Sequence, residues 1–312
     1  MKIKVFLKIL RNFLYDAVRY TKHSGSLIHE NDKRRLSAHL KMDFHRIEKG
    51  LALKDCRPGF GLDVVERLMA NTRRYEEFYG PSEITKWVKQ ALGEYRAFNR
   101  GHGISLDSLD EFLSNSKFEK NDGGTQIIDP EELRCRSKID FHAFAHSRHS
   151  VRHFSENPVE FEDIKDAILA ASRTPSVCNR QSAHAHIVLS EPLKTELLAV
   201  QGGNRGFGHQ IPSLIVVTSE LRNFVTAAER YQCWVDGGLF AMSLIYGLHA
   251  KGLATCMLNW SVDPSRDIAA RKLLNLSDTE NIIVMIAVGH FPSQLRVAQS
   301  PRLPVDTMLS IH

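Results

Sequence analysis

The sequence predicts an α+β protein in which a central mixed sheet is flanked by helices and preceded by an all-helical region. Two observations support this fold class. Between residues 161 and 289, four apolar strand patterns alternate with helical ones, whereas almost nothing before residue 117 alternates like a strand. With 312 residues, 43% hydrophobic and 25% charged, the chain has the composition of a globular protein of about two domains at ~150 residues each.

The first half consists of helical patterns separated by glycine and proline. They span residues 33–53, 62–78, 82–99 and 107–116. Ser82 is a suitable N-cap for the third. The chain then becomes polar and irregular, and residues 121–124 are its loosest point. We therefore divide the chain into a helical N-terminal domain (1–116), a linker (117–139) and an α+β domain (140–312).

The second half contains four predicted strands, at residues 184–190, 213–219, 253–258 and 281–289. The helices around them are expected at residues 161–172, 191–200, 223–250 and 264–274. Asp263 and Pro264 suit the N-cap and first position of the last helix. Residues 235–248 are so evenly apolar that their helix must be covered on all sides, which one small sheet cannot do. We therefore expect a homodimer in which the second subunit helps to cover this helix.

Residues 1–22 form a basic amphipathic helix. Apolar side chains recur at steps of three and four, and six Lys or Arg residues stand against a single acid, Asp16. This excess equals the net charge of +5 of the whole chain, so the other residues are neutral overall, which argues against a nucleic-acid-binding core. Such a helix could lie on an anionic membrane surface, or pack on the protein's own body or on a partner subunit. The sequence leaves both alternatives open.

The cysteine pattern and the hydropathy pattern indicate a compartment. Five cysteines stand at wide, irregular spacing without a Cys-x-x-Cys pair, which is typical of reduced thiols in a cytoplasm. No run approaches the ~18 apolar residues of a membrane-spanning helix. The first apolar run is cut by Lys8 and Arg11, which argues against a signal peptide. We expect a cytoplasmic protein, soluble or in peripheral contact with the inner face of the membrane through residues 1–22.

Two arginines and a hydroxyl occupy alternate residues shortly before the helix at 161–172. On an extended segment, residues two apart point the same way, so Arg148, Ser150 and Arg152 would converge on one ligand. Guanidinium groups offer paired donors that suit phosphate and planar carbonyl groups. The pattern predicts an anion site, although an exposed charged strand has the same pattern.

A polar turn then leads into the first strand. Pro175 ends the preceding helix, and Ser176, Asn179 and Gln181 supply neutral donors and acceptors. An ordinary turn explains the proline and the serine, but less readily the whole polar set. Near the C-terminus, Arg302 stands in a proline-containing tail, where a single arginine is usually solvated.

Two other patterns do not predict a site. The glycine-rich residues 202–208 have neither the order nor the flanking strand of a nucleotide-binding loop. Four histidines are closely spaced in the sequence: His142, His146, His149 and His153. We expect them to straddle a helix end and an extended segment and so to diverge, and we predict no metal site.

In their order along the chain, these segments resemble the FMN-dependent nitroreductase family. The family's Arg-x-Ser-x-Arg/Lys stretch is matched by residues 148–152, and its Pro-Ser-x-x-Asn-x-Gln turn by residues 175–181. Its Gly-Leu-x-(Ser/Thr) strand is matched by residues 252–255, and its Val-Gly-His and Arg-x-Pro close lies within residues 288–304. The resemblance covers about residues 140–312 and implies a nitroreductase-like three-layer fold.

The resemblance implies a noncovalently bound FMN at a homodimer interface. Arg148, Ser150 and Arg302 would hold the phosphate and ribityl end, and His149 belongs to the same cofactor-binding stretch. Arg152 would lie near the pyrimidine edge of the flavin, where a cation favours reduction of the ring.

The resemblance also implies which residues contact the flavin ring. The polar turn would line the ring, in this family often from the partner subunit. Its implied contacts are Pro175, Ser176, Asn179 and Gln181. Outside the turn, the matching positions are Asn204, Leu258 and Asn259.

The implied activity is a ping-pong reaction. NADH or NADPH would deliver hydride through flavin N5 to an unidentified small oxidised acceptor. This chemistry needs position and charge more than an acid–base pair, and no catalytic residue is evident in the sequence. Two alternatives stay open. One is a flavin-binding or flavin-free scaffold on a membrane-associated assembly, for example one that makes polysaccharide. The other is a flavoenzyme that acts on a specific metabolite without nicotinamide.

The N-terminal half contains one dense polar cluster. His45 and Glu48 share a helical face and form either a proton-handling pair or an ion pair that locks two helices together. Arg46, Lys49 and Arg57 lie close by in the sequence, which leads to the hypothesis that this domain caps the flavin and reaches an anionic substrate.

Overall fold

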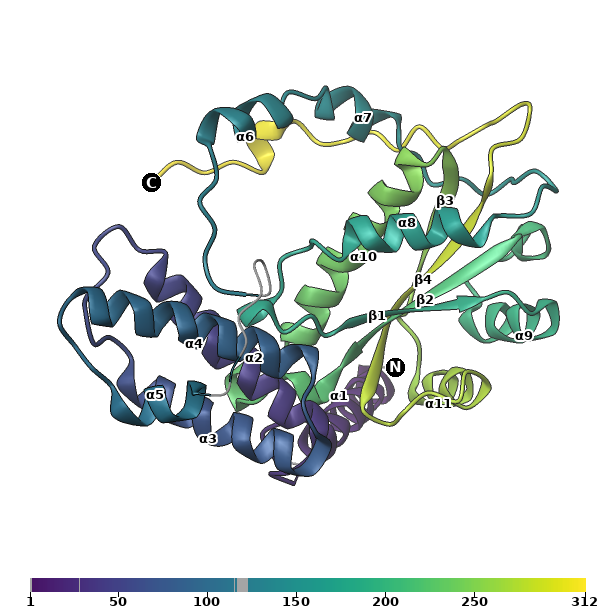
Figure 1. Ribbon diagram of the computed structural model, residues 1–312. Helices are drawn as coiled ribbons and strands as arrows, with labels where there is room; N and C mark the ends of the chain where they lie inside the picture. Colours follow the sequence, from purple (N-terminus) through teal and green to yellow (C-terminus); the bar gives the residue numbers. More distant parts are fainter. Residues whose placement is uncertain (1, 28, 115, 117–122) are drawn as a thin grey trace.

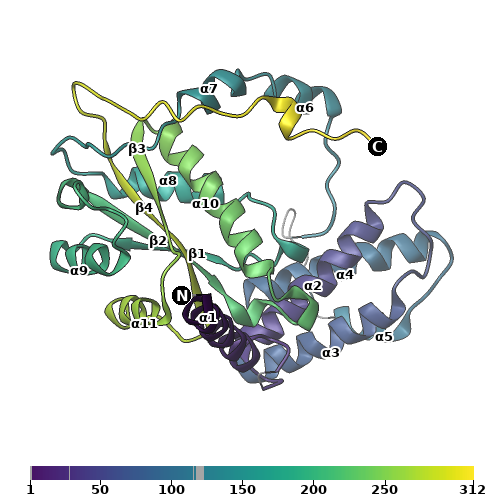
Figure 2. The same cartoon turned by 180° about the vertical axis from the view of Figure 1, so that it is seen from behind.

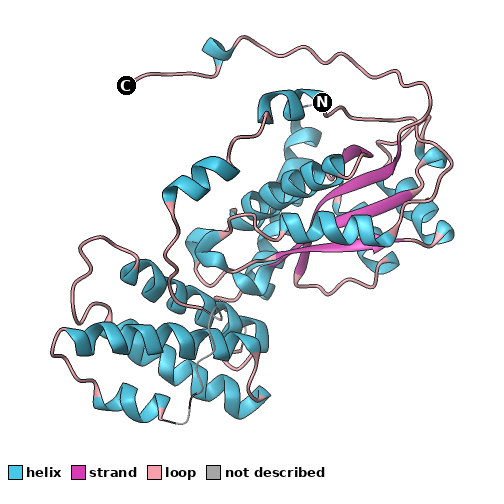
Figure 3. Cartoon of the chain, turned by 45° about the horizontal axis from the view of Figure 1, so that its top comes forward, coloured by secondary structure: helices cyan, strands magenta, loops and turns pink. Residues whose placement is uncertain are grey.

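The computed structural model describes residues 2–27, 29–114, 116 and 123–312 of the chain (Figure 1). Within these residues, one sheet lies between helices on both of its faces, and a second region consists of helices without a strand (Figure 3). The predicted α+β class, with three layers in the second half, is confirmed.

The sheet has four strands in the order β1-β2-β4-β3. Their bounds are Ala183–Val188 (β1), Ser213–Glu220 (β2), Leu253–Asn259 (β3) and Glu280–His290 (β4). All three ladders are antiparallel, and the single parallel pairing among the described residues is the isolated bridge between Ser150 and Thr255. The expected mixed sheet is therefore antiparallel apart from this bridge. An apolar run predicts burial but not strand direction, because side chains alternate in the same way in both pairings.

Helices cover both faces of the sheet (Figure 1). On one face lie α8 (Phe161–Ala171) and α10 (Gln232–Ala250), and on the other lie α9 (Glu191–Gln201) and α11 (Pro264–Leu273). Alternate residues of β2 enter different cores, with Ile215 packed under α8 and α10 and Leu214 packed on the side of α9 and α11. The predicted alternation of strands and helices thus buries both faces of the sheet.

Helix α10 begins at Gln232, nine residues later than the sequence pattern predicted. The preceding residues form two short 3₁₀ turns, Leu221–Asn223 and Ala227–Glu229. The Glu220 carboxylate caps the first turn by accepting from the Arg222 N–H over 3.1 Å. The Glu229 carboxylate caps the second by accepting hydrogen bonds from the backbone N–H groups of Val225 (2.8 Å) and Thr226 (3.1 Å). Periodicity alone cannot show such a side-chain cap, which competes with the helix for the same backbone donors.

One side of α10 stays uncovered in the single chain. Trp234, Val235 and Leu239 are 41%, 51% and 48% exposed, although the opposite side of the helix is buried against the sheet. The even apolar pattern of this helix is therefore only partly explained by its own chain.

The second region is a bundle of α2 (Lys33–Leu51), α3 (Leu62–Tyr79), α4 (Glu83–Gly101) and α5 (Asp107–Leu113). It has a core of its own, which includes Leu40, Leu68 and Leu92, each fully buried. Ser82 is the N-cap residue of α4, as predicted, and its N–H donates to Thr85 Oγ1 over 3.0 Å. The four helices of this bundle correspond to the four helical patterns in the sequence.

Two short helices follow the bundle in the chain and precede the sheet. The first lies in the predicted linker, where none was expected, and the second ends among the closely spaced histidines, where a helix end was expected. These helices are α6 (Pro130–Arg136) and α7 (Phe141–Ser147). Each follows an aspartate that caps it: Asp129 accepts from the Glu131 N–H and Asp140 from the Ala143 N–H, both over 2.9 Å. Of the predicted linker, residues 117–122 lie outside the described residues, and so does the 121–122 part of its loosest point.

Helix α1 (Lys2–His23) lies beside α11 (Figure 2), where the Tyr15 hydroxyl donates to Asp267 over 2.7 Å. Asp263 and Pro264 are the N-cap and first residues of α11, as predicted, but the Asp263 carboxylate does not cap the helix. Instead it forms a salt bridge with Lys8 of α1 over 2.9 Å. Among the described helices, α1 included, none combines the length and the apolar character needed to cross a bilayer.

Candidate functional site

The first group of predicted residues surrounds one cavity near the C-terminal end of α10. Residues after α7 run beside β3, where the Val151 N–H donates to the Thr255 carbonyl over 2.8 Å. The C-terminal tail passes the same place. The cavity measures about 490 Å³, and its lining includes Arg148, His149, Ser150, Arg152 and Arg302. We call it the arginine cavity. The structure thus brings Arg302 next to Arg148 and Arg152, from which it is separated by about half of the chain.

The arginine cavity is positively charged. Its arginines form no salt bridge within the described residues: Arg152 donates only to the Ser150 carbonyl (3.5 Å), and Arg302 to the Ser300 carbonyl. At the edge of the cavity, the Ser147 hydroxyl lies 2.7 Å from His249 Nε2 of α10. Burial, together with the charge of Arg148, lowers the pKa of His249. Unpaired guanidinium groups around a cavity of this size match the chemistry of a phosphate ester.

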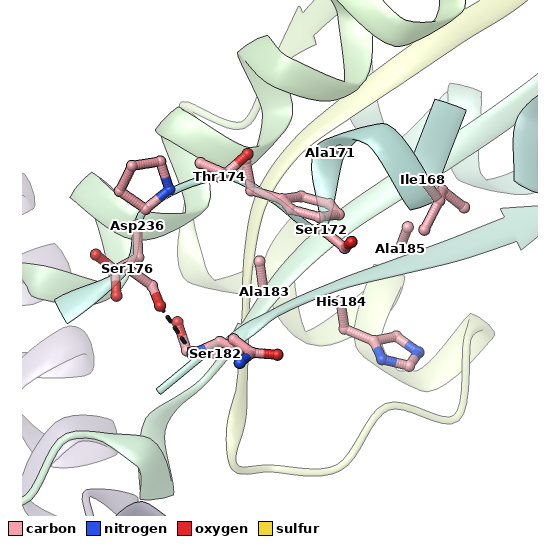
Figure 4. A pocket seen from close by; sticks show the side chains of 13 residues that line it. Ile168, Ala171, Ser172, Thr174, Ser176, Ser182, Ala183, His184, Ala185 and Asp236 are labelled. Carbon is pink, nitrogen blue, oxygen red and sulfur yellow. Dashed lines mark hydrogen bonds between the residues drawn. The ribbon is translucent and has the colours of Figure 1, made fainter. Parts of the chain in front are cut away.

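The second group lies around a different cavity, of about 280 Å³, beside α8, α10 and the start of β1 (Figure 4). Pro175, Ser176 and Gln181 of the polar turn line it, as does Asp236 of α10. We call it the turn cavity. The Gln181 N–H donates to Ser176 Oγ over 2.9 Å, which closes the turn, and Asn179 Oδ1 accepts from Gln181 Nε2 over 3.2 Å.

The backbone of this turn is strained. Cys178, Asn179 and Gln181 have φ values of 48°, 52° and 52°, in the left-handed region that residues other than glycine rarely adopt. The surrounding structure holds them there. Asp236 accepts a hydrogen bond from the Val177 N–H over 3.2 Å, and burial raises the pKa of the Asp236 carboxyl. Strain of this kind costs about 1–3 kcal/mol per residue and gathers at ligand-binding sites.

The buried side of the turn is anchored by Arg180. Its side chain is fully buried, pairs with the Glu229 carboxylate and lies 5.8 Å from the ring of Phe224. The hydrogen bonds of Arg180 hold the pKa of Glu229 below its ordinary value, although burial acts in the opposite direction. The same Glu229 carboxylate caps the second 3₁₀ turn before α10, so one ion pair joins the polar turn to the segment that leads into this helix.

The helical bundle reaches the same turn through Lys41 of α2. Its Nζ donates to the Arg180 carbonyl over 3.1 Å, and Asn223 Nδ2 donates to the same oxygen over 3.1 Å. Burial lowers the pKa of Lys41 to about 8. Sequence analysis did not identify Lys41, because 139 residues separate it from its partner. Arg180 stands inside the recognised motif, but the motif does not show that its side chain points inward.

The third group lies at the end of β3 and lines neither cavity. Asn204 and Asn259 are joined through Gln201, whose amide donates to the Asn259 carbonyl (3.0 Å) and accepts from Asn204 Nδ2 (3.1 Å). The Leu258 side chain is only 4% exposed and belongs to the core. In the single chain, these predicted ring contacts are therefore engaged in local packing.

The two cavities lie near opposite ends of α10. Asp236 lines the turn cavity, whereas His249 lies beside the arginine cavity. Thirteen residues of α-helix separate them, which at about 1.5 Å per residue corresponds to roughly 20 Å. One chain therefore presents the predicted phosphate site and the predicted ring site as two distant surfaces.

The polar cluster of the bundle is mostly engaged in internal pairs. His45 Nδ1 lies 3.4 Å from Glu48 Oε2, and Glu48 Oε1 accepts from the Gly124 N–H over 3.0 Å. Burial raises the pKa of Glu48. Arg46 donates to the fully buried Asp43 over 3.1 Å. Arg46, which was expected to reach a substrate, is thus already paired within α2.

Three of the four closely spaced histidines lie near one another, contrary to the expectation that they diverge, because His146 both stacks on His142 and lines the arginine cavity together with His149. The rings of His142 and His146 stack at 4.1 Å, His149 lines the arginine cavity, and His153 Nδ1 lies 2.8 Å from Gln210 Oε1. Within the described residues, no group of three or more His, Cys, Asp or Glu side chains is placed to hold a metal ion.

The fold of this chain is similar to those of several solved structures. A nitroreductase family protein from Streptococcus pneumoniae is 20% identical over 55% of this chain and 100% of its own, with a TM-score of 0.48. An FMN-dependent nitroreductase from Clostridium difficile R20291 is 18% identical over 50% and 91%, with a TM-score of 0.44. A proposed NAD(P)H:FMN oxidoreductase from Staphylococcus epidermidis is 20% identical over 55% and 96%, with a TM-score of 0.48.

The family comparison covers the region that holds the sheet. No curated protein matches the chain. The sequence model of the nitroreductase family matches residues 145–201 and 191–290, which include the Arg-x-Ser-x-Arg stretch, the polar turn and all four strands. The region from residue 145 to residue 290 belongs to the nitroreductase family.

Proposed function

We propose that the protein is an FMN-dependent oxidoreductase that transfers hydride from NADH or NADPH to a small oxidised acceptor. When bound, FMN would supply the two-electron chemistry. The observation that supports this proposal best is the arginine cavity, where three guanidinium groups without acidic partners face one space. All five cysteines are unpaired, which suits a cytoplasmic protein.

The residues of the arginine cavity would hold the cofactor by its anionic end. Arg148, Ser150 and Arg302 would donate to the phosphate and ribityl oxygens, since charged hydrogen bonds to phosphate are short and strong. Arg152 would place a positive charge beside the pyrimidine edge, where a cation favours reduction. We assign no acid–base residue, because the proposed transfer depends on position and charge.

We further propose that the active form is a homodimer whose sites are shared. The arginine cavity and the turn cavity lie roughly 20 Å apart along α10, so one chain does not gather both around one ligand. A second subunit packed on the exposed side of α10, at Val235 and Leu239, would cover this apolar stripe and bring its own turn toward the first subunit's arginines.

The colour of the purified full chain tests the cofactor and the donor. We expect yellow protein whose flavin absorbance bleaches without oxygen on addition of NADH or NADPH and returns when an acceptor is added. Colourless protein that cannot be loaded with FMN would contradict the proposal. If the protein is yellow but neither NADH nor NADPH bleaches it, the result would support flavin binding and exclude nicotinamide as the electron donor.

Mixing two defective variants tests the shared site. The first variant carries Arg148→Ala with Arg302→Ala, and the second carries Asn179→Ala with Gln181→Ala. Each mixed dimer would contain one intact site, so random reassociation is expected to restore about a quarter of the wild-type activity. If each site lay within one chain, every site in the mixture would carry a defect, and activity would not return.

A further inference from the structure

Helix α1 is held to the protein body by its polar side. Within the described residues, the members of α1 that are only partly exposed are Asn12, Tyr15, Arg19, Tyr20 and His23. The Tyr15 hydroxyl donates to Asp267 of α11. Arg19 Nη2 donates to the Glu280 carbonyl at the start of β4 over 2.8 Å. This side of α1 therefore lies on α11 and on the end of the sheet where β4 begins (Figure 2).

A cavity of about 420 Å³ lies between α1 and α11 in this contact. Four of the side chains that line it are positively charged, whereas Asp278 is the one acidic side chain among the described lining residues. The four cations are Arg19 and Lys22 of α1 and Arg271 and Lys272 of α11. We call this space the α1–α11 cavity. Packing of α1 thus gathers charges of one sign from opposite ends of the chain.

Two guanidinium groups of this cavity share one acceptor. Arg19 Nη2 and Arg271 Nη1 both donate to the Glu280 carbonyl. Arg271 is only 6% exposed, and burial, together with the charge of Arg19, lowers its pKa. Burial and the charge of Arg19 also lower the pKa of His23, which lines the same cavity. Without a ligand these cations therefore repel one another, and an anion between them would relieve the repulsion.

Many hydrogen-bond donors of the α1–α11 cavity are unused. Within the described residues, Arg19 forms hydrogen bonds through Nη2 alone, which leaves the donors of its Nε and Nη1. Lys22 and Lys272 are exposed and form neither a hydrogen bond nor a salt bridge in the described part of the chain. The site thus offers guanidinium and ammonium donors from two helices at once.

Nearby negative charge does not cancel this cluster. Asp16 and Asp267 line a neighbouring cavity of about 90 Å³ rather than this one, and Asp267 is engaged by the Tyr15 hydroxyl. Asp278 is exposed and forms no salt bridge among the described residues. The C-terminal ends of α1 and α11 each contribute about half a negative charge. Asp278 and the two helix ends together offset about two of the four positive charges, so a surplus remains at the cavity.

We propose that the α1–α11 cavity binds a polyvalent phosphate, either a diphosphate or a phosphate ester. Phosphate oxygens accept the charged hydrogen bonds that arginine and lysine offer here. The remaining lining includes the apolar side chains of Val18, Ile268 and Leu276, which suit the carbon portion of an ester. A bound phosphate would replace repulsion by attraction and would fasten the end of α1 to α11.

This site is separate from the arginine cavity. Strand β4 begins at Glu280, beside the α1–α11 cavity, and reaches the arginine cavity near Val288. There Val288 pairs with Thr255, which is bridged to Ser150 of the arginine cavity. Eight residues of strand correspond to roughly 25 Å. The proposed phosphate is therefore not the phosphate of the proposed FMN.

The experiment is calorimetric titration of the full chain with inorganic diphosphate at constant ionic strength. We expect a binding site that persists in the variant Arg148→Ala with Arg302→Ala, because that variant changes only the arginine cavity. Lys22→Gln with Lys272→Gln should weaken binding about tenfold or more, since two charged contacts are lost. Without diphosphate, this lysine variant should unfold at the temperature of the wild type or above it, because repulsion is reduced. That measurement checks that the variant folds.

Lys2→Gln with Lys4→Gln is the matched control, because it removes the same charge from the other end of α1, where both lysines are exposed. It should bind diphosphate as the wild type does. The proposal is overturned if the Arg148/Arg302 variant no longer binds diphosphate, or if the Lys22/Lys272 variant binds it as tightly as the wild type. Equal weakening in the control would also overturn it, since binding would then follow the overall charge of α1.

A lipid headgroup offers the same phosphate chemistry, and a second measurement distinguishes the two sources. The wild type is floated with vesicles of phosphatidylcholine and phosphatidic acid, with and without diphosphate. Protein that floats and is released by diphosphate uses the site for a lipid phosphate, whereas protein that does not float uses it for a soluble one. Either result supports a phosphate site, and none of these outcomes depends on the proposed hydride transfer.

Discussion

The arginine cavity and the turn cavity differ in how they are held. The arginines stand on an extended segment and on an exposed tail, and they form no salt bridges within the described residues. The turn is fastened by a buried arginine, by an aspartate of α10 and by a lysine of the helical bundle. The arginine cavity thus presents unpaired positive charges, whereas the turn cavity is held in place by packing and hydrogen bonds.

Because of this difference, the arginine cavity should determine how tightly the ligand binds, and the turn should determine how well the ligand-free protein holds its conformation. Residues that have no charged partner before the ligand binds contribute to ligand binding but add little to the stability of the ligand-free protein. Residues that hold a strained turn contribute to stability before any ligand arrives, because strain persists only where the surroundings over-determine it. The four predictions below test this separation, beginning with the largest expected effect.

The double variant Arg148→Ala with Arg302→Ala should weaken FMN binding about a hundredfold or more. Each charged hydrogen bond contributes about 1.5–3 kcal/mol, and about 1.4 kcal/mol corresponds to a factor of ten. Fluorescence titration of the apoprotein with FMN measures the effect. Thermal unfolding without FMN should stay unchanged. Arg205→Ala, at an exposed position away from both cavities, is the control. If the wild type, the double variant and the control bound FMN equally tightly, the arginine cavity would not be the FMN-binding site.

Arg180→Met should destabilise the free protein by about 3 kcal/mol. The substitution leaves the Glu229 carboxylate, only 16% exposed, without its buried partner, and an uncompensated charge of this kind is costly. Urea unfolding of the apoprotein measures the loss, and Arg173→Met at an exposed neighbouring position is the control. If both variants unfold at the same urea concentration, the turn is not anchored by Arg180.

Lys41→Met should reveal a pH-dependent contribution on the order of 2 kcal/mol. The pKa of Lys41 falls from 10.5 to about 8 in the folded protein. Between these values the unfolded chain binds more protons, so the stability of the wild type should rise with pH relative to the variant. Urea unfolding at several pH values from 7 to 10.5 measures this change, with Lys49→Met as the exposed control on α2. A difference that stays constant over this range would show that Lys41 is not buried as the structure describes.

Ser176→Ala should have the smallest effect, about 1 kcal/mol of stability. It removes the acceptor of the Gln181 N–H and so loosens the closure of the turn. Ser172→Ala is the control, because within the described residues the Ser172 hydroxyl bonds to the Leu169 carbonyl of α8 and to no residue of the turn. Thermal unfolding of both apoproteins compares them. A larger loss in the Ser172 variant would contradict the assigned closure.

Local sequence patterns predicted most of the elements. The bundle helices and all four strands follow the predicted ranges within a few residues, because hydrophobic periodicity reports local geometry directly. The predictions were wrong where hydrogen bonds from side chains, rather than hydrophobic periodicity, determine the backbone conformation. Glu220 and Glu229 cap the 3₁₀ turns that replace the first residues of the expected helix at 223–250, and Asp129 caps a helix inside the segment that was expected to be irregular.

The candidate site could be predicted only in part. The alternate spacing of Arg148, Ser150 and Arg152 placed them on one side of an extended segment, and the family resemblance added Arg302. Neither could show that Asn204 and Asn259 are tied together by Gln201, because that network joins α9 to the end of β3. Lys41 gave no signal at all, since its role depends on a partner in another region.

The sequence by itself determined the class of fold, the positions of the main helices and strands, and the chemistry available at each motif. Only the tertiary structure decided which side of α1 faces outward, how far apart the two cavities lie, and that the bundle supports the polar turn. Periodicity and residue chemistry are properties of neighbouring residues. Contacts such as Lys8 with Asp263 and Lys41 with Arg180 arise only when distant segments pack together, and no local pattern records them.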